Sequence, residues 1–122
     1  MTLTNGSSNG SAVNSNRDPN PYGHIVRFSE SRTDDTAFSW DIFLLAGDPS
    51  YDANVPPDQL VFGSPDGIWV DPSGIVWIQT DISNSSQNRP DRGYDNIKNN
   101  GMLVADPSTG EVRRFLVGPR GC

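Results

Sequence analysis

The sequence predicts an all-β protein, specifically part of a β-propeller with about one and three-quarter four-stranded antiparallel blades. Short β-branched and aromatic runs indicate strands, and clusters of Asp, Pro, Ser and Gly between them indicate turns. Helices are not expected, because the chain has 13 Asp but only 2 Glu, together with 12 Gly and 10 Pro. That composition favours turns and disfavours helices.

The clearest hairpin lies within residues 63–81. Two apolar runs, 68–70 and 75–80, flank a turn at 71–74 with the sequence Asp-Pro-Ser-Gly. Asp at the first position, Pro at the second and Gly at the fourth are typical of a type I turn. Both runs are more apolar than a half-solvated strand, so we expect the hairpin to be covered on both faces.

Further strands and loops follow from the same signals along the rest of the chain. The other strands are expected at 2–5, 23–30, 38–46, 102–106 and 111–117. The loops are expected at 6–20, 48–62 and 82–100, where polar residues, Gly and Pro predominate. A loop as long as 82–100 is uncommon in a compact domain and usually indicates function or disorder.

The strands repeat in a way that predicts blades. Residues 63–117 form a complete four-stranded meander, and residues 1–47 match its second, third and fourth strands in order. Such meanders repeated around an axis are propeller blades, and a propeller needs four to eight of them to close. We therefore expect a fragment of one propeller domain, with its remaining blades outside this chain. A small free-standing β-sandwich is the alternative, disfavoured because its unpaired edges would promote aggregation.

Composition argues against several partners. The net charge of −6 and the pI near 4.4 argue against nucleic acid, which requires clustered Lys and Arg. No apolar run approaches the roughly 18 residues of a membrane span. No signal peptide is expected within this chain, because no basic and apolar leader follows Met1. The single cysteine, Cys122, excludes an internal disulfide.

Two carboxylates flank the hairpin where its apolar signal stops. Asp66 precedes the first run and Asp81 follows the second, so an antiparallel pairing brings both to the same end. Calcium prefers hard oxygen ligands, and Pro65 and Gly67 frame Asp66 in a turn that can approach an ion. Both aspartates are therefore candidate metal ligands. The alternative for each is a local turn or loop cap with no ligand.

Other polar residues are weaker candidates. Asn5 ends the strand equivalent to 75–80, so its amide can join a calcium shell or donate to a phosphate, or simply cap a loop. Arg120 can bind a phosphate bidentately, although many such arginines are solvated loop residues. His24 is the only histidine and is expected to be structural, because one imidazole alone makes neither a metal site nor a nucleophile–base pair.

Four segments in the same order resemble the C-terminal part of the PhoX-type alkaline phosphatases. They are residues 20–27, 40–49, 63–81 and 105–122. Each motif alone is modest, since Ser-Pro-Asp-Gly occurs in many propellers, but the four together are specific. The resemblance covers essentially the whole chain, including residues 2–5.

This resemblance implies a propeller that hydrolyses small-molecule phosphate monoesters, with calcium and iron ions in its central channel. It also implies export by the twin-arginine route, so the full-length parent is expected to be periplasmic or secreted. Family members are several times longer, and their pattern continues with an acidic residue where this chain stops at Cys122. The chain by itself is therefore expected to show no measurable activity and weak or no metal binding. Residues 89–93 are expected to lie at the substrate edge.

Two other functions stay open at this point. Calcium-dependent lactonase propellers carry a similar Pro-Asp-Gly in which the aspartate is a metal ligand. A propeller used only for binding is the second alternative, because a fold does not determine a function. Assays of the full-length parent on p-nitrophenyl phosphate and on a lactone, with and without a chelator, separate the three.

Overall fold

The structure, a computed structural model, describes residues 1–4, 19–33 and 36–119. No α-helix occurs among these residues, and no helix is long and apolar enough to cross a membrane. The elements are β1 (Thr2–Leu3), β2 (His24–Ser29), β3 (Ser39–Leu45), β4 (Pro65–Val70), β5 (Val76–Thr80), a 3-10 turn η1 (Pro90–Arg92), β6 (Gly101–Ala105) and β7 (Val112–Val117).

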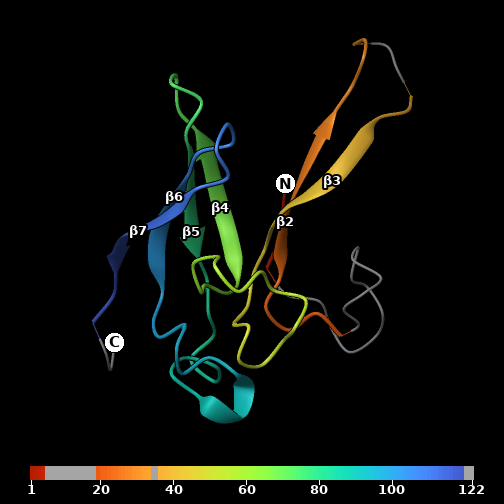
Figure 1. Cartoon of the computed structure of the whole chain (residues 1–122). Coiled ribbons are helices and arrows are strands. Elements are labelled where there is room, and N and C mark those ends of the chain that lie inside the picture. Colours follow the sequence, from red (N-terminus) through yellow and green to blue (C-terminus); the bar gives the residue numbers. More distant parts are fainter. Residues whose placement is uncertain (5–18, 34–35, 120–122) are drawn as a thin grey trace.

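The strands form two antiparallel sheets, and this confirms the predicted blade pattern. One sheet contains β1, β2 and β3, and the other contains β4, β5, β6 and β7, each in sequence order. The second sheet is the complete meander, and the first has three strands. Figure 1 shows the sheets close together where β4 begins and diverging toward the opposite end. At the close end β1 contacts β4.

The hairpin of β4 and β5 has the tight turn that its sequence predicts. The Gly74 N–H donates to the Asp71 carbonyl at 2.9 Å, and Gly74 adopts a positive φ of 86°. The Trp77 indole N–H donates to Asp71 Oδ2 at 3.0 Å. This bond, with backbone donors from the turn, holds the pKa of Asp71 below its usual value. The turn is therefore fixed by local hydrogen bonds.

The start of β4 differs from the prediction. β4 begins at Pro65, because Pro65 pairs with Thr80, and the register shifts between Pro65 and Ile68. Proline is tolerated at the first position of a strand, where its missing N–H does not interrupt a ladder. Asp66 therefore lies inside β4, at its second residue, and not just before the strand.

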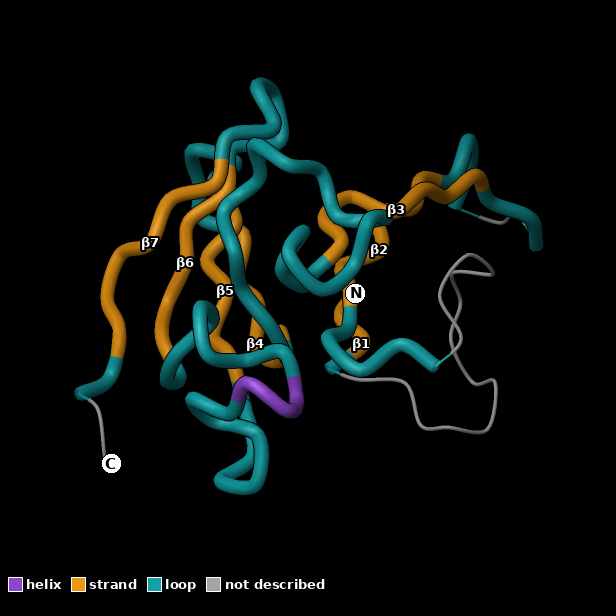
Figure 2. Tube along the Cα trace, turned by 60° about the horizontal axis from the view of Figure 1, so that its bottom comes forward, coloured by secondary structure: helices purple, strands orange, loops and turns teal. Residues whose placement is uncertain are grey.

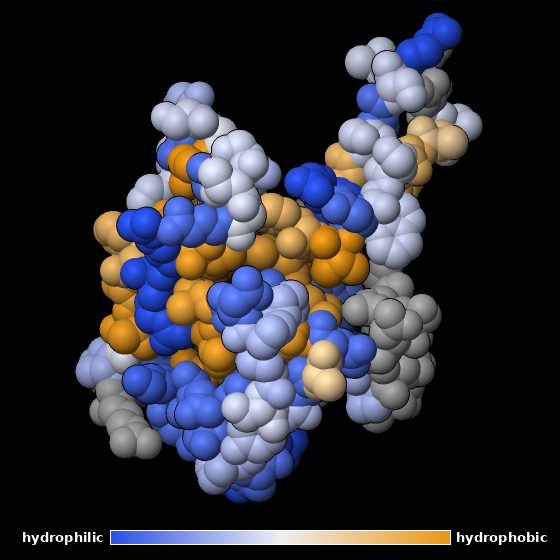
Figure 3. All heavy atoms as spheres, viewed as in Figure 1, coloured by the Kyte–Doolittle hydropathy of each residue, from blue (hydrophilic) through white to orange (hydrophobic). Residues whose placement is uncertain are grey.

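The expectation that this hairpin is covered on both faces is wrong for this chain. Ile68, Trp69 and Val70 are 38%, 59% and 57% exposed. The cause is that β4 is an edge strand of its sheet, and β1, its neighbour from the other sheet, has only two residues. Figure 3 shows apolar side chains gathered over the four-stranded sheet on the face of the molecule seen in that view.

The core lies between the two sheets near their close end. Phe62, which is 1% exposed, packs there with residues of both sheets, such as Leu44 and Ile78. Phe62 also forms an isolated antiparallel bridge with Gly47, just beyond β3. The other buried members of this cluster are Tyr22, Ile25, Ala46, Val76, Ile82, Tyr94, Ile97, Leu103 and Ala105. This shared core holds the two sheets together.

Candidate functional site

The predicted site residues that the structure describes lie at the end of the sheets where β4 begins and β5 ends. Pairing of Pro65 with Thr80 brings Asp66 and Asp81 to this end. The Asp81 N–H donates to the carbonyl of Ser64 at 2.8 Å. Figure 2, which brings this end forward, shows the 3-10 turn and the long loops lying across it. We call this region the loop end.

Asp66 is exposed and contacts the first sheet. The Thr2 hydroxyl donates to the Asp66 backbone carbonyl at 2.7 Å, and the Thr4 hydroxyl donates to Asp66 Oδ1 at 3.4 Å. The exposed Gln79 side chain lies against Gly67, the residue after Asp66. The aspartate is thus presented at the seam between the two sheets.

The residues of this chain do not by themselves fit a complete metal site. Within the described ranges, no three His, Cys, Asp or Glu side chains are close enough to hold an ion together. Calcium takes six to eight oxygen ligands, so Asp66 or Asp81 can supply only part of a shell. Asn5 and Arg120, the other two predicted site residues, lie outside the described residues.

A buried pair of hydroxyl groups that the sequence analysis did not predict includes Ser64, two residues before Asp66. Ser64 and Tyr94 are each 3% exposed, and their hydroxyls are 2.9 Å apart. The Tyr94 hydroxyl also donates to the carbonyl of Pro21 at 2.9 Å. A carbonyl can only accept, so the Tyr94 proton goes to Pro21 and Ser64 donates to Tyr94. The sequence signal that could have indicated this contact is Tyr94 itself, the one aromatic residue in the polar stretch 82–100.

The loop 82–100 is attached to the loop 48–62 by the two residues that follow Tyr94. The Tyr51 hydroxyl donates to Asp95 Oδ1 at 2.8 Å, and the Asn96 amide donates to Asp48 Oδ2 at 2.7 Å. Asp48 is only 2% exposed. Burial alone would raise the pKa of Asp48, but the bonds from Asn96 and from the Ser50 backbone outweigh it and lower that pKa.

The segment 89–93, predicted to form the substrate edge, is a short exposed turn. Arg89 Nε and Nη2 donate to the two carboxylate oxygens of Asp91, both at 2.8 Å. This pairing lowers the pKa of Asp91. The Arg89 guanidinium is therefore already occupied by a carboxylate in this structure. The role of this segment at a substrate edge stays a prediction.

His24, predicted to be structural, is fully buried. Its Nδ1 lies 2.7 Å from the side-chain nitrogen of Asn20. Asn20 Oδ1 in turn accepts the N–H of Gly23 at 3.0 Å. These contacts are those of a residue that orders the start of β2.

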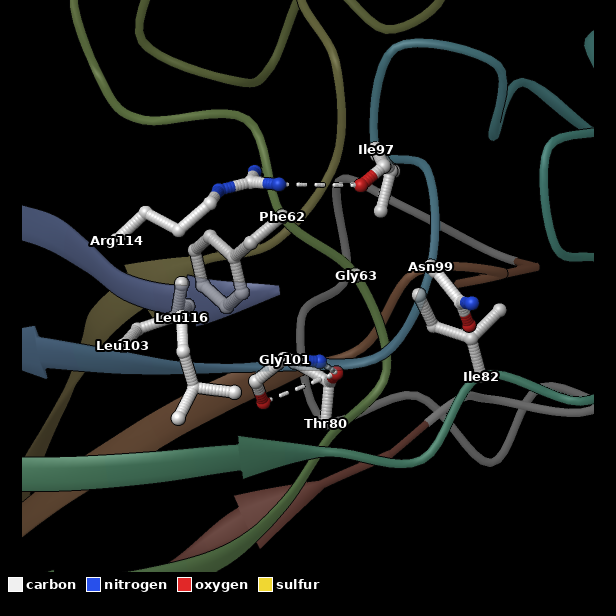
Figure 4. Close-up of a pocket in the computed structure, with 10 residues that line it drawn as sticks. All are labelled: Phe62, Gly63, Thr80, Ile82, Ile97, Asn99, Gly101, Leu103, Arg114 and Leu116. Carbon is white, nitrogen blue, oxygen red and sulfur yellow. Dashed lines mark hydrogen bonds between the residues drawn. The ribbon is translucent and has the colours of Figure 1, made fainter. Parts of the chain in front are cut away.

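A small pocket behind the loop end is too small for substrate. Figure 4 shows it between Phe62, the aliphatic side chains of the four-stranded sheet and the end of loop 82–100. Its volume is about 10 Å³, which is roughly the space for one water molecule. Arg114 closes one side by donating to the carbonyls of Val61 at 2.7 Å and Ile97 at 3.4 Å. Burial lowers the pKa of Arg114.

A larger apolar groove of about 270 Å³ separates the two sheets. Ile25 and Phe43 line it from one sheet, and Ile68 and Val70 line it from the other. Its lining is mainly apolar, and the Arg27 guanidinium that also lines it is paired with the Asp41 carboxylate, so the groove is unsuited to binding a phosphate. The loop end is thus the part of the described chain where exposed carboxylates and buried polar contacts meet.

Comparison with known proteins identifies the family. The family model described as alkaline phosphatase PhoX matches residues 1–122. The chain belongs to the PhoX alkaline phosphatase family. Its structure is similar to that of Pseudomonas fluorescens PhoX in complex with vanadate, a transition state analogue, with 40% sequence identity and a TM-score of 0.78. That similarity covers 99% of this chain and 23% of the Pseudomonas chain. A search of curated proteins found no match.

Proposed function

We propose that this chain forms part of a PhoX phosphatase that hydrolyses small-molecule phosphate monoesters, and that the loop end contributes to its central channel. The observation that carries the proposal is the similarity, at 40% identity over 99% of the chain, to a PhoX structure in complex with vanadate. Vanadate is described there as a transition state analogue. Tight binding of such analogues is expected of a site complementary to the transition state.

Within that assembly, Asp66 serves as one ligand in a metal site completed by segments beyond this chain. Its exposure at the seam between the sheets and the support from Thr2 and Thr4 favour this role. Asp81 is a second candidate at the same end, and Asn5 and Arg120 stay predictions. Calcium and iron as the ions, and a periplasmic or secreted location, follow from the family resemblance. The described residues of this chain do not supply a full ligand set by themselves.

The proposal is tested by replacing the matching segment of Pseudomonas fluorescens PhoX, 23% of that chain, with these 122 residues. We call this protein the grafted enzyme. It is expected to hydrolyse p-nitrophenyl phosphate, to lose activity with a chelator and to leave a lactone intact. The isolated 122-residue chain is expected to be inactive. A folded grafted enzyme with no phosphatase activity, or an isolated chain as active as the grafted enzyme, would overturn the proposal.

Asp66→Asn in the grafted enzyme tests the role of the carboxylate, because it removes one charge with little change in shape. Activity is expected to fall about 10-fold or more, as for the loss of a group that supports a metal centre. Asp58→Asn is the matched control, since Asp58 is an exposed aspartate of the loop 48–62. Equal activities of the two variants would contradict the assignment of Asp66.

A further inference from the structure

We propose that Tyr94 and Ser64 are positioning residues that fix Asp66 and Asp81 relative to each other and to the first sheet. This inference rests on the proposed function, because it concerns the same loop end. Neither residue is one of the candidate ligands. Both act through the backbone that carries those ligands.

Ser64 is held on three sides. Its N–H donates to the carbonyl of Tyr22 at 2.7 Å, its carbonyl accepts the N–H of Asp81 at 2.8 Å, and its hydroxyl contacts the Tyr94 hydroxyl at 2.9 Å. The residue after it, Pro65, has no N–H and a restricted φ. Ser64 thus joins the start of β4, the end of β5 and the entry to β2 at one buried point.

The backbone of Ser64 is in an uncommon conformation. Its φ is +54°, in the left-handed region that residues other than glycine rarely adopt. Such conformations persist only where the surrounding contacts impose them, and they concentrate at functional sites. The hydrogen bond to Tyr94, together with the backbone bonds to Tyr22 and Asp81, imposes it, and β4, which begins at the next residue, presents Asp66 two residues after Ser64.

Tyr94 extends this restraint to the other sheet. Its hydroxyl donates to the carbonyl of Pro21, close to the start of β2, while accepting from Ser64 before β4. Its ring also packs against Tyr22, with a centroid separation of 5.3 Å. The phenol therefore adds a side-chain link between the two sheets at the end where Thr4 meets Asp66. Loss of its hydroxyl releases that spacing without removing the apolar ring.

The test uses four forms of the grafted enzyme: the parent, Tyr94→Phe, Ser64→Gly and the double variant. Ser64→Gly removes the hydroxyl but makes the positive φ easier, so it separates the lost contact from backbone strain. Each single variant is expected to lower kcat about 10- to 100-fold, as small displacements of reacting groups do. KM is expected to stay nearly constant. The double variant is expected to be no worse than Tyr94→Phe, because that variant already lacks the hydroxyl contact that Ser64→Gly removes.

Tyr51→Phe is the matched control. It removes a tyrosine hydroxyl bond of about the same length, 2.8 Å to Asp95, which is the residue next to Tyr94. It is expected to leave kcat unchanged. Thermal unfolding of each variant checks that losses in kcat are measured on folded protein, and Ser64→Gly keeps the test open if Tyr94→Phe does not fold.

Hydrogen–deuterium exchange gives a readout besides activity. Exchange at the Ser64 and Asp81 amides is expected to be faster in Tyr94→Phe and unchanged in Tyr51→Phe. Full kcat in Ser64→Gly, or unchanged exchange in Tyr94→Phe, would overturn the inference. An inactive parent graft would count against the proposed function instead, and the exchange data alone would then decide whether Tyr94 restrains this end.

Discussion

Removal of the Phe62 ring is expected to separate the two sheets. Phe62 is 1% exposed and belongs to a core cluster that includes residues of both sheets. A fully buried aromatic side chain removes about 150–250 Å² from water, which at about 25 cal/mol per Å² corresponds to roughly 4–6 kcal/mol. Phe→Ala changes in protein cores cost about 3–5 kcal/mol. We expect Phe62→Ala to cost about the same.

This loss is large against the whole stability of a small domain, which is about 5–15 kcal/mol. The assay is urea unfolding of the 122-residue chain, followed by the fluorescence of its three tryptophans. Phe38→Ala is the matched control, because Phe38 is 56% exposed and its ring contacts Phe28, at a centroid separation of 5.5 Å, near the tip of β2 and β3. It is expected to cost less than about 1 kcal/mol, as surface changes do.

The reasoning is refuted if Phe62→Ala and Phe38→Ala lower the free energy of unfolding by the same amount. It is also refuted if the loss at Phe62 is below about 1 kcal/mol, since removing an aromatic ring from a packed core costs about 3–5 kcal/mol. A transition that becomes two separate steps in Phe62→Ala is the outcome that best supports a shared core between the sheets.

Further predictions concern the loops. Gly93→Ala is expected to destabilise the chain more than Gly74→Ala in urea unfolding. Both glycines have a positive φ, which costs an alanine about 1–2 kcal/mol. At Gly93 an added Cβ would also collide with the Tyr22 hydroxyl, whereas at Gly74 it would meet open space. Equal losses of stability in the two variants would contradict this reasoning. Asp48→Asn is expected to cost about 1.5–3 kcal/mol at pH 7, because it places an amide nitrogen against Asn96. The pKa of Asp48 is lowered by folding, so its contribution is present above the unfolded pKa of about 3.9 and is lost as pH falls through the lower folded value. The difference in unfolding free energy between the parent and Asp48→Asn should therefore shrink below about pH 4, and a difference independent of pH would exclude the mechanism.

Much of the architecture could be predicted from local sequence. The turn at Asp71 and Gly74 and the alternation of short apolar runs predicted the strand order, because turn chemistry and hydrophobic runs act between residues close in sequence. The aspartates at the two ends of one hairpin could be placed together for the same reason, since antiparallel pairing alone brings Asp66 and Asp81 to one end. The segment resemblance was specific enough to indicate the family.

The sequence could not predict which apolar strands are covered within this chain. The runs of β4 predicted burial on both faces, yet Trp69 is 59% exposed. Burial depends on what packs against a strand, and the chain spans only 23% of the similar PhoX chain. The start of β4 was also missed, because a register shift between Pro65 and Ile68, which the residues do not reveal, separates its first pair, Pro65 with Thr80, from the rest of the ladder.

The strands, the turns between them and the family could all be predicted from the residues, because these depend on neighbours in the chain and on motif order. The contact of Tyr94, from the long polar loop, with Ser64 and Pro21 is a property of the folded chain, because these residues are 30 and 73 positions away in sequence. Such contacts depend on how two sheets and two loops pack in three dimensions. No local pattern encodes them, and for that reason the buried hydroxyl pair of Ser64 and Tyr94 appears only in the folded chain.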